Sequence, residues 1–466
     1  MEPAEIEENV NKIKELLKSE DFNVVNTGLE LVRSLDEEAV YENLLEGCGA
    51  DKEGKLVNEK KEISDYLVCS LASISNGKKA KEILDNVTKL DLSWNKSLTN
   101  VDGLANLTNL VELHLSNCQS LTNVGALANL TNLTRLYLNS CKSLTNVDGL
   151  AKLTNLANLD LYFCKSLTNV DGLAKLTNLV ELNLSNCQSL TNIDGLANLT
   201  NLVELHLSNC QKRGCQSLIN VGALANLTNL TRLYLNSCES LTNVDVLANL
   251  TNLTSLDLSN CQSLTNVGAL ANLTNLTNLN LNSCESLTNV DGLANFTSLT
   301  SLDLSWNKSI TNIDGLANLT NLVELNLSFC ESLTNIDGLA NLTNLVELNL
   351  SNCQSLTNVD VLANLTNLTS LDLISCKSLT NVDGLTNLIN LTVLDLSGCK
   401  SLSNIDGLAK LTNLNYLSLK DCDNINVIPD PTSDDLGDIV ELDVEELEGE
   451  ELKSYLQKIR DHISSK

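Results

Sequence analysis

A single stretch of sequence recurs along most of the chain, and its period limits the possible folds more than any other feature. The stretch LTNVDGLANLTNLVELHLSNC, from Leu98 to Cys118, is followed by many near copies. Each copy carries an L-x-L motif, and the motifs that begin between Leu90 and Leu417 define fifteen units. Successive motifs are 23 residues apart, except for one step of 28 where QKRGC (residues 211–215) is inserted. A repeat of this length predicts a solenoid of stacked coils rather than several separate globular domains.

Within one unit the leucine spacing changes from two to three, which predicts two kinds of local structure. Leu113 and Leu115 alternate with polar residues, as in a short strand that turns both leucines inward. In DGLANL, from Asp102 to Leu107, the leucines are three residues apart, which is typical of a tight helical turn. One strand and one returning turn complete a coil, and stacked coils place their strands side by side in parallel.

The unit L-x-x-L-x-L-x-x-C-x-S-L-T-N-V-D-G-L-A-N-L-T-N closely resembles leucine-rich repeat proteins over roughly residues 86–426. Its VDGLANLTNL half is similar to the internalin and phosphatase-regulator type, and its CxSLTN half to the cysteine-containing type of F-box proteins. The resemblance implies an α/β solenoid, a right-handed horseshoe with a parallel β-sheet on the concave face and 3-10 or turn segments on the convex face. It also implies protein–protein recognition, but the mixture of types implies no particular partner.

The two ends of the chain differ from the repeats. Residues 1–85 read as amphipathic helices, with Asp36 as a helix N-cap and residues 49–58 as a polar connection. A repeat stack needs its exposed apolar end covered, so we expect this region to be a helical N-terminal cap. Residues 427–466 read as an acidic linker followed by a short amphipathic helix, whose apolar side carries Leu452, Leu456 and Ile459.

Thirteen of the sixteen cysteines occupy one repeated position, five residues after the first leucine of the L-x-L motif. This position turns the chain out of the strand, where an asparagine side chain satisfies buried backbone groups and a thiol does so more weakly. The spacing contains no C-x-x-C pair of the kind that binds metals. We expect a structural ladder of reduced thiols, no metal and a cytoplasmic location. The ladder consists of Asn95, Cys118, Cys141, Cys164, Cys187, Cys210, Cys238, Cys261, Cys284, Asn307, Cys330, Cys353, Cys376, Cys399 and Cys422.

Differences between the units concentrate around the strand, on side chains expected to face the concave side. These positions form rows across a parallel sheet, and most of them are polar and acidic. Exposed aromatic and arginine residues are the usual energetic anchors of protein interfaces. The candidate partner-binding residues are Trp94, Glu112, His114, Arg135, Tyr137, Asp160, Tyr162, Phe163, His206, Arg232, Tyr234, Trp306 and Phe329. The alternative is that these residues arose by block duplication, since LDLSWNKS occurs at Leu90 and again at Leu302.

Composition and motifs narrow the class of function. The net charge of -29 repels phosphate backbones and favours a protein or peptide partner with a basic surface. No apolar run reaches the roughly 18 residues of a membrane span, and no nucleophile–base set or nucleotide-binding loop is present. We therefore predict a non-enzymatic, monomeric scaffold that needs no cofactor. Two alternatives stay open: a regulatory subunit of a phosphatase or another enzyme, and a host-directed effector or adhesin of internalin type.

Overall fold

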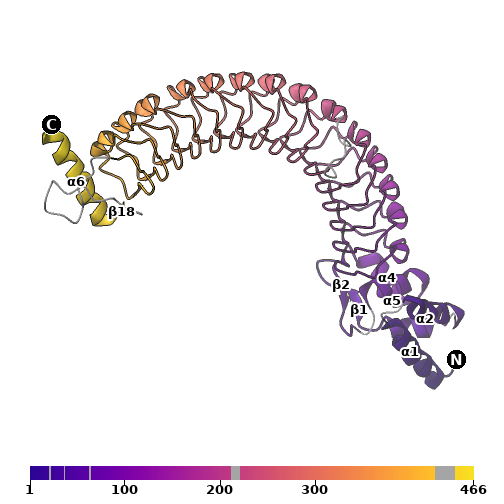
Figure 1. Ribbon diagram of the computed structural model, residues 1–466. Helices are drawn as coiled ribbons and strands as arrows, with labels where there is room; N and C mark the ends of the chain where they lie inside the picture. Colours follow the sequence, from indigo (N-terminus) through magenta and orange to yellow (C-terminus); the bar gives the residue numbers. More distant parts are fainter. Residues whose placement is uncertain (20–21, 36, 62–63, 211–220, 426–446, 466) are drawn as a thin grey trace. The chain divides into compact units, whose positions relative to one another are not determined.

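The computed structural model describes residues 1–466 except 20–21, 36, 62–63, 211–220, 426–446 and 466 (Figure 1). The chain divides into two compact units, Met1–Leu230 and Thr231–Lys466.

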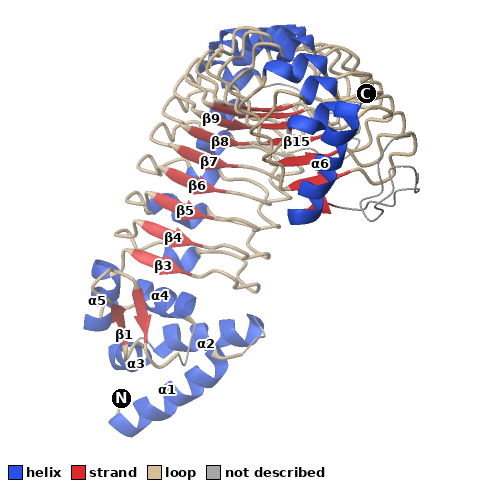
Figure 2. Ribbon diagram, turned by 90° about the vertical axis from the view of Figure 1, so that its left-hand side faces the viewer, coloured by secondary structure: helices blue, strands red, loops and turns tan. Residues whose placement is uncertain are grey.

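In the first unit, every coil contributes one short strand to a parallel sheet (Figure 2). The pairing keeps the repeated leucines in line, so that Leu90 lies opposite Leu113 and Leu113 opposite Leu136. The central leucine of each strand is buried and its two neighbours point away from the core. The strands are β3 (Lys89–Asp91), β4 (Glu112–His114), β5 (Arg135–Tyr137), β6 (Asn158–Asp160), β7 (Glu181–Asn183) and β8 (Glu204–His206).

The second unit repeats this arrangement and ends with one antiparallel strand. Its parallel strands are β9 (Arg232–Tyr234), β10 (Ser255–Asp257), β11 (Asn278–Asn280), β12 (Ser301–Asp303), β13 (Glu324–Asn326), β14 (Glu347–Asn349), β15 (Ser370–Asp372), β16 (Val393–Asp395) and β17 (Tyr416–Ser418). The last strand, β18 (Leu447–Glu448), pairs with β17 in the antiparallel direction.

On the convex side of each unit the chain returns through 3-10 segments. In the first unit these are η1 (Asp102–Leu104), η2 (Gly125–Asn129), η3 (Asp148–Leu150), η4 (Asp171–Leu173), η5 (Asp194–Leu196) and η6 (Gly222–Asn226). In the second unit they are η7 (Asp245–Asn249), η8 (Gly268–Asn272), η9 (Asp291–Leu293), η10 (Asp314–Leu316), η11 (Asp337–Leu339), η12 (Asp360–Asn364), η13 (Asp383–Leu385) and η14 (Asp406–Lys410).

Close stacking of the coils explains why the sequence changes so little on this side. A Cβ atom at Gly172 would lie 2.4 Å from the carbonyl oxygen of Val147 in the preceding coil, so only glycine fits without a shift. The asparagine of the LTN triplet that follows a 3-10 segment also bonds the coil before it, as Asn132 Nδ2 does to Thr108 O at 2.9 Å. The packing of each coil therefore depends on the sequence of the neighbouring coil.

The ladder position makes the same kind of contact inside the core. Cys118 Sγ donates to Leu92 O at 3.3 Å, and later cysteines repeat this bond to the carbonyl 26 residues earlier. Asn307 replaces the thiol with an amide, whose Nδ2 donates to Leu281 O at 2.9 Å and to Leu304 O at 2.7 Å. Asn95 stands at the first ladder position, is only half-buried and accepts a hydrogen bond from Ser97 Oγ.

The N-terminal region contains α1 (Pro3–Leu17), α2 (Phe22–Leu35), α3 (Glu38–Leu44), α4 (Asp65–Ile74) and α5 (Lys78–Asn86). The expected polar connection at residues 49–58 is wrong, because β1 (Cys48–Ala50) and β2 (Leu56–Asn58) form an antiparallel hairpin there. Gly54, at a φ of +76°, closes its turn, and the Gly54 carbonyl accepts hydrogen bonds from the backbone amides of Thr88 and Lys89. The hairpin thus covers the outer edge of β3. The expected N-cap, Asp36, lies outside the described residues.

Helix α4 lies directly against the first coil. Ser73 Oγ donates to the carbonyl of Gly103 at 2.8 Å, and Asn106 Nδ2 donates back to the carbonyl of Ser73. A Cβ atom at Gly103 would meet the hydroxyl of Ser70, so this glycine permits the close approach of the helix. These contacts satisfy the polar groups of an otherwise open coil.

The C-terminal helix α6 (Gly449–Ser465) packs against the last coils of the second unit. Leu452, Leu456 and Ile459 are buried on one of its sides, and Arg460 Nε donates to Ala409 O at 2.6 Å. Within the described ranges, no helix is long and apolar enough to cross a membrane. The predicted class of fold, a leucine-rich-repeat solenoid with a parallel sheet, convex 3-10 turns and a helical N-terminal cap, is confirmed.

Candidate functional site

Strands β4 and β5 bring four of the predicted residues into one polar cluster on the strand face, the surface formed by outward side chains of the sheet. The register places Glu112 opposite Arg135 and His114 opposite Tyr137. Arg135 donates from Nε and Nη2 to Glu112 Oε2, while His114 Nε2 lies 2.8 Å from Glu112 Oε1. The rings of His114 and Tyr137 stack with centroids 4.4 Å apart. Hydrogen bonds from Arg135 hold the pKa of Glu112 below its ordinary value.

This cluster is ordered yet accessible. The Arg135 side chain is 43% exposed and that of Glu112 only 16% exposed, so the carboxylate lies beneath the groups that bind it. Such an arrangement holds an arginine and an aromatic ring in fixed positions before a partner arrives, which lowers the entropy lost on binding. It offers a partner a planar cation and an aromatic face.

A second group lies one coil further on and is aromatic and basic. Tyr162 and Phe163 stack with ring centroids 5.8 Å apart, and Lys165 Nζ lies 4.3 Å from the Phe163 ring. Lys142, from the preceding coil, lies 5.6 Å from the same ring. Asp160 is partly buried and accepts a hydrogen bond from the backbone amide of Tyr162, and burial raises the pKa of its carboxyl group. The structure thus places the predicted residues Arg135 and Tyr137 in the first group and Tyr162 and Phe163 in the second.

Phe163 belongs to a row of residues that share an unusual backbone conformation. All of them follow a strand, and all have a φ between 52° and 72°. We call them the edge row: Trp94, Asn117, Ser140, Phe163, Asn186, Asn209, Ser237, Asn260, Ser283, Trp306, Phe329, Asn352, Ser375, Gly398 and Asp421. Asparagine, aspartate and glycine tolerate this left-handed region, whereas a bulky side chain is strained there by about 1–2 kcal/mol.

Four aromatic residues nevertheless occupy the edge row. Trp94 is 69% exposed and Trp306 is 42% exposed. In the second unit, Trp306 stacks on Phe329 with ring centroids 3.9 Å apart and planes inclined by 9°. Lys308 lies 5.9 Å from the Trp306 ring and pairs with Glu331 at 2.9 Å. The stack is therefore a defined surface feature with a cation beside it.

The remaining predicted residues lie on strands β8 and β9. His206 Nε2 lies 2.8 Å from Glu204 Oε1, which repeats the His114–Glu112 pair on another strand of the first unit. Arg232 and Tyr234 flank the buried Leu233 on the first strand of the second unit, so both side chains belong to its strand face.

The strand face of the second unit is acidic. The register places Glu324 directly opposite Glu347, and both side chains are exposed. Asp372 lies opposite Asp395, and the pKa of Asp372 is raised by burial, with a further contribution from the Asp395 charge. Like charges directly opposite one another destabilise a sheet, and a basic partner would relieve this repulsion. In the described part of the chain, no group of His, Cys, Asp or Glu could hold a metal ion.

The sequence pattern predicted the aromatic residues of the site but not the neighbouring groups and backbone conformation that position them. The lysines beside Phe163 and Trp306, and the left-handed backbone of the edge row, were not predicted. The sequence does contain a pattern that indicates the left-handed backbone, because the residues aligned with Phe163 in the other repeats are mostly asparagine and serine. That preference is typical of a left-handed turn position.

Comparison with protein families places the chain in a known class. The BspA-type leucine-rich repeat region, in six copies, matches residues 92–214. Zer-1-like leucine-rich repeats match residues 244–313, and the leucine-rich repeat domain of the endo-beta-N-acetylglucosaminidase EndoS matches residues 290–383. All three models describe repeats. The chain is a leucine-rich repeat protein with cysteine-containing units of about 23 residues.

Among solved structures, three of the similar chains come from two bacteria. An internalin of Listeria monocytogenes, InlF, is 28% identical with a TM-score of 0.52, over 72% of this chain and 87% of the internalin. The functional domain of InlJ from the same species, described as including a cysteine ladder, is 25% identical with a TM-score of 0.52, over 73% and 74%. A leucine-rich repeat protein of Leptospira interrogans is 23% identical with a TM-score of 0.59, over 74% and 86%, and shows the fold alone. No curated protein sequence matches the chain.

Proposed function

We propose that this protein is a non-enzymatic scaffold that binds a protein or peptide through the strand face and the adjoining edge row. The observation that carries the proposal is the placement of Trp94, Phe163, Trp306 and Phe329 at left-handed positions. Each of these residues combines a strained backbone with an exposed or partly exposed ring. The same row shows that asparagine and serine satisfy the fold there, so the rings contribute nothing that stacking of the coils requires.

The chemistry of the surface indicates what the partner presents. Aromatic rings with neighbouring cations form the anchors, as in many protein interfaces. Between them the strand face carries carboxylates, including the opposed pair Glu324 and Glu347. A partner with basic side chains would pair with those carboxylates and would present apolar or aromatic groups to the edge row.

The experiment uses the repeat to supply its own substitutions. A first variant carries Phe163→Asn, Trp306→Asn and Phe329→Asn, each of which introduces the residue most common in the edge row. A second carries Arg135→Asn and Tyr137→Asn, because asparagine occupies both equivalent positions in other units. A control carries Asn186→Ser and Asn260→Ser. Wild type and variants are used to capture partners from a lysate of the source cell, with identification by mass spectrometry.

We expect one or more proteins to be retained by wild type and by the control but lost from an aromatic or arginine variant of unchanged circular dichroism. Retention of every captured protein by all variants would contradict the proposal and leave the aromatic residues as products of block duplication. A kinase or phosphatase captured in fixed ratio would identify the scaffold as a regulatory subunit.

The similarity to two Listeria internalins favours a second candidate, a host-directed effector or adhesin of internalin type. The two candidates predict different locations. We propose a cytoplasmic, monomeric protein, because the ladder thiols donate hydrogen bonds to buried carbonyls and so use the reduced form of cysteine. Fractionation of the source cell separates the candidates, since an adhesin is found at the surface or outside the cell.

A further inference from the structure

The first unit contains a groove that shares only Trp94 with the binding surface proposed above. It has a volume of about 1310 Å³ and lies between the helical cap and the first coil. Its walls are the C-terminal end of α1, parts of α2 and α4, and the segment that follows β3. Trp94 lines one side of it, and this is the only lining residue that also belongs to the predicted strand-face site.

Among the described residues that line the groove, the charge is opposite to that of the protein. Its lining includes two acids, Asp65 and Asp102, in a chain whose net charge is -29. Asp65 also accepts a hydrogen bond from Asn58 at 2.8 Å. The lining bases outnumber these acids and are Lys18, Arg33, Lys61 and Lys96.

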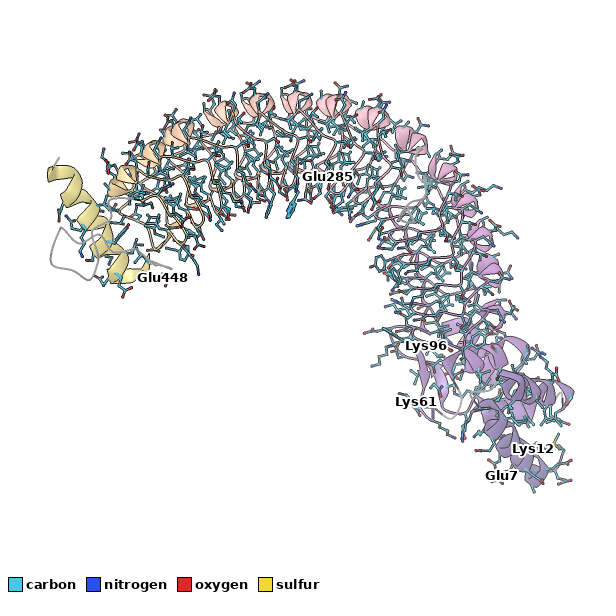
Figure 3. All side chains as sticks on the ribbon, viewed as in Figure 1. Glu7, Lys12, Lys61, Lys96, Glu285 and Glu448 are labelled. Carbon is cyan, nitrogen blue, oxygen red and sulfur yellow. The ribbon has the colours of Figure 1, made fainter. Side chains whose placement is uncertain are left out.

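Most of these bases form no ion pair with another described residue. Lys18 pairs with Glu15 at 3.2 Å on the surface of α1. Among the described residues, Arg33, Lys61 and Lys96 take part in no ion pair, and all three are exposed. Figure 3 shows Lys61 and Lys96 on the same side of the first unit, and both line the groove. A cluster of cations on an otherwise acidic protein attracts a negatively charged ligand selectively, because the rest of the surface repels it.

The groove also has apolar surface. Trp94 is 69% exposed and Ile74, at the end of α4, is 39% exposed, although both are large hydrophobic residues. Val25 and Leu29 on α2 are half-buried and complete this wall. An inorganic anion would leave this surface exposed to water, whereas a peptide with aliphatic or aromatic side chains would cover it.

We propose that this groove binds an acidic peptide segment of a partner protein. Carboxylates of the segment pair with Lys18, Arg33, Lys61 and Lys96, and an apolar side chain of the segment lies against Trp94 and Ile74. The site is separate from the strand face of the second unit, whose acidic side chains favour a basic partner.

A selection of random peptides tests the chemistry without knowledge of the partner. A phage-displayed peptide library is selected on the immobilised full-length protein, and enriched peptides are synthesised with a fluorescent label. Their dissociation constants are measured by anisotropy for wild type and for the variant Lys61→Glu with Lys96→Glu. The matched control carries Lys377→Glu with Lys400→Glu, which changes the net charge equally at positions aligned with Lys96 in other units. Circular dichroism checks that each variant is folded.

The expected result is a set of enriched peptides rich in aspartate and glutamate that also contain large apolar residues. The groove variant should bind them about tenfold or more weakly than wild type, and the control about as wild type does. Binding should also weaken as salt is added. Substitution Trp94→Asn, with the residue most common in the edge row, should weaken binding without changing the charge.

Three outcomes would overturn the proposal. The first is a selection that enriches no peptide, or only peptides poor in acidic residues. The second is an equal loss of affinity in the groove variant and in the control, which would show a long-range effect of net charge. The third is unchanged affinity in both variants, which would place the peptide elsewhere on the molecule.

Discussion

Raising the pH above about 8.5 should destabilise the repeat stack steeply, because the ladder thiols are held in their protonated form by burial. Burial raises the pKa of Cys118 to about 11 and the pKa values of Cys141, Cys284 and Cys330 to about 12. In the unfolded chain a thiol has a pKa near 8.5. Above that pH the unfolded state releases protons that the folded state keeps, so the free energy of unfolding falls as the pH rises. Below about pH 8 both states are protonated and the ladder contributes no pH dependence.

The size of the effect follows from the difference between the two pKa values. One pH unit above the unfolded value, at about pH 9.5, each thiol lowers the free energy of unfolding by about 1.4 kcal/mol. Cys118, Cys141, Cys284 and Cys330 together lower it by about 6 kcal/mol on the same basis. Burial also raises the pKa of Cys164 and other ladder thiols, and these add to the loss. The free energy of unfolding of a domain is commonly only about 5–15 kcal/mol. Unfolding at room temperature should therefore begin between about pH 8.5 and pH 9.5.

Urea unfolding followed by far-ultraviolet circular dichroism at pH 7.5, 8.5 and 9.5 measures this dependence, with a phosphine reductant present throughout. Lysine and tyrosine titrate near pH 10, so the interval chosen reports mainly on thiols. A variant with Cys141→Ala and Cys284→Ala should be less stable at pH 7.5 but should lose less stability on going to pH 9.5. The reasoning is refuted if the urea midpoint of wild type is unchanged across the interval, or if the variant shows the same dependence on pH.

Substitutions at three further positions test the packing of the coils, each followed by urea unfolding. Asn307→Ala removes two hydrogen bonds to buried carbonyls and should lower the free energy of unfolding by about 2–3 kcal/mol. Asn307→Cys introduces the usual residue of the ladder and should lower it by less than about 1 kcal/mol. Equal losses in the two variants would show that these hydrogen bonds do not stabilise the stack. Gly172→Ala places a Cβ atom 2.4 Å from the Val147 carbonyl oxygen. This overpacking should lower the free energy of unfolding by about 1–3 kcal/mol. An unchanged urea midpoint would show that the two coils can move apart without loss of stability. Ser73→Ala removes the hydrogen bond to the Gly103 carbonyl and should lower the free energy of unfolding by about 1 kcal/mol. Amide hydrogen exchange should increase in the first coil. An equal increase in distant coils would argue against a local capping role for Ser73.

The class of fold could be predicted from the sequence because the repeat imposes it in many copies at once. The 23-residue period placed Leu113 and its equivalents in the centre of parallel strands, and the structure has them there with the expected register. The ladder position was also recognisable, since the same position of the repeat holds either cysteine, as at Cys118, or asparagine, as at Asn307. Each of these features recurs, so a single ambiguous copy did not matter.

Features that occur once were not predictable in the same way. The sequence predicts a polar connection where the hairpin of β1 and β2 lies, because these strands are three residues long and KEG lies between them. Its stability depends on the bond from the Thr88 amide to the carbonyl of Gly54, a contact between residues distant in sequence. The groove beside the cap is likewise formed by segments that are separate in the chain. Local pattern carries no information about such contacts.

The same distinction explains where binding can evolve in this molecule. Residues such as Gly172 and Leu113 face a neighbouring coil, so a substitution at one of them changes the packing between coils. The edge row, the strand face and the cap groove are free of this constraint. In the first unit the cap groove concentrates cations such as Lys61 and Lys96, while the strand face carries carboxylates such as that of Glu181. A scaffold with two surfaces of opposite charge is suited to holding an acidic and a basic partner together. We therefore expect a partner captured through the strand face to be retained by the Lys61→Glu, Lys96→Glu variant, and peptides selected on the groove to be unaffected by Arg135→Asn.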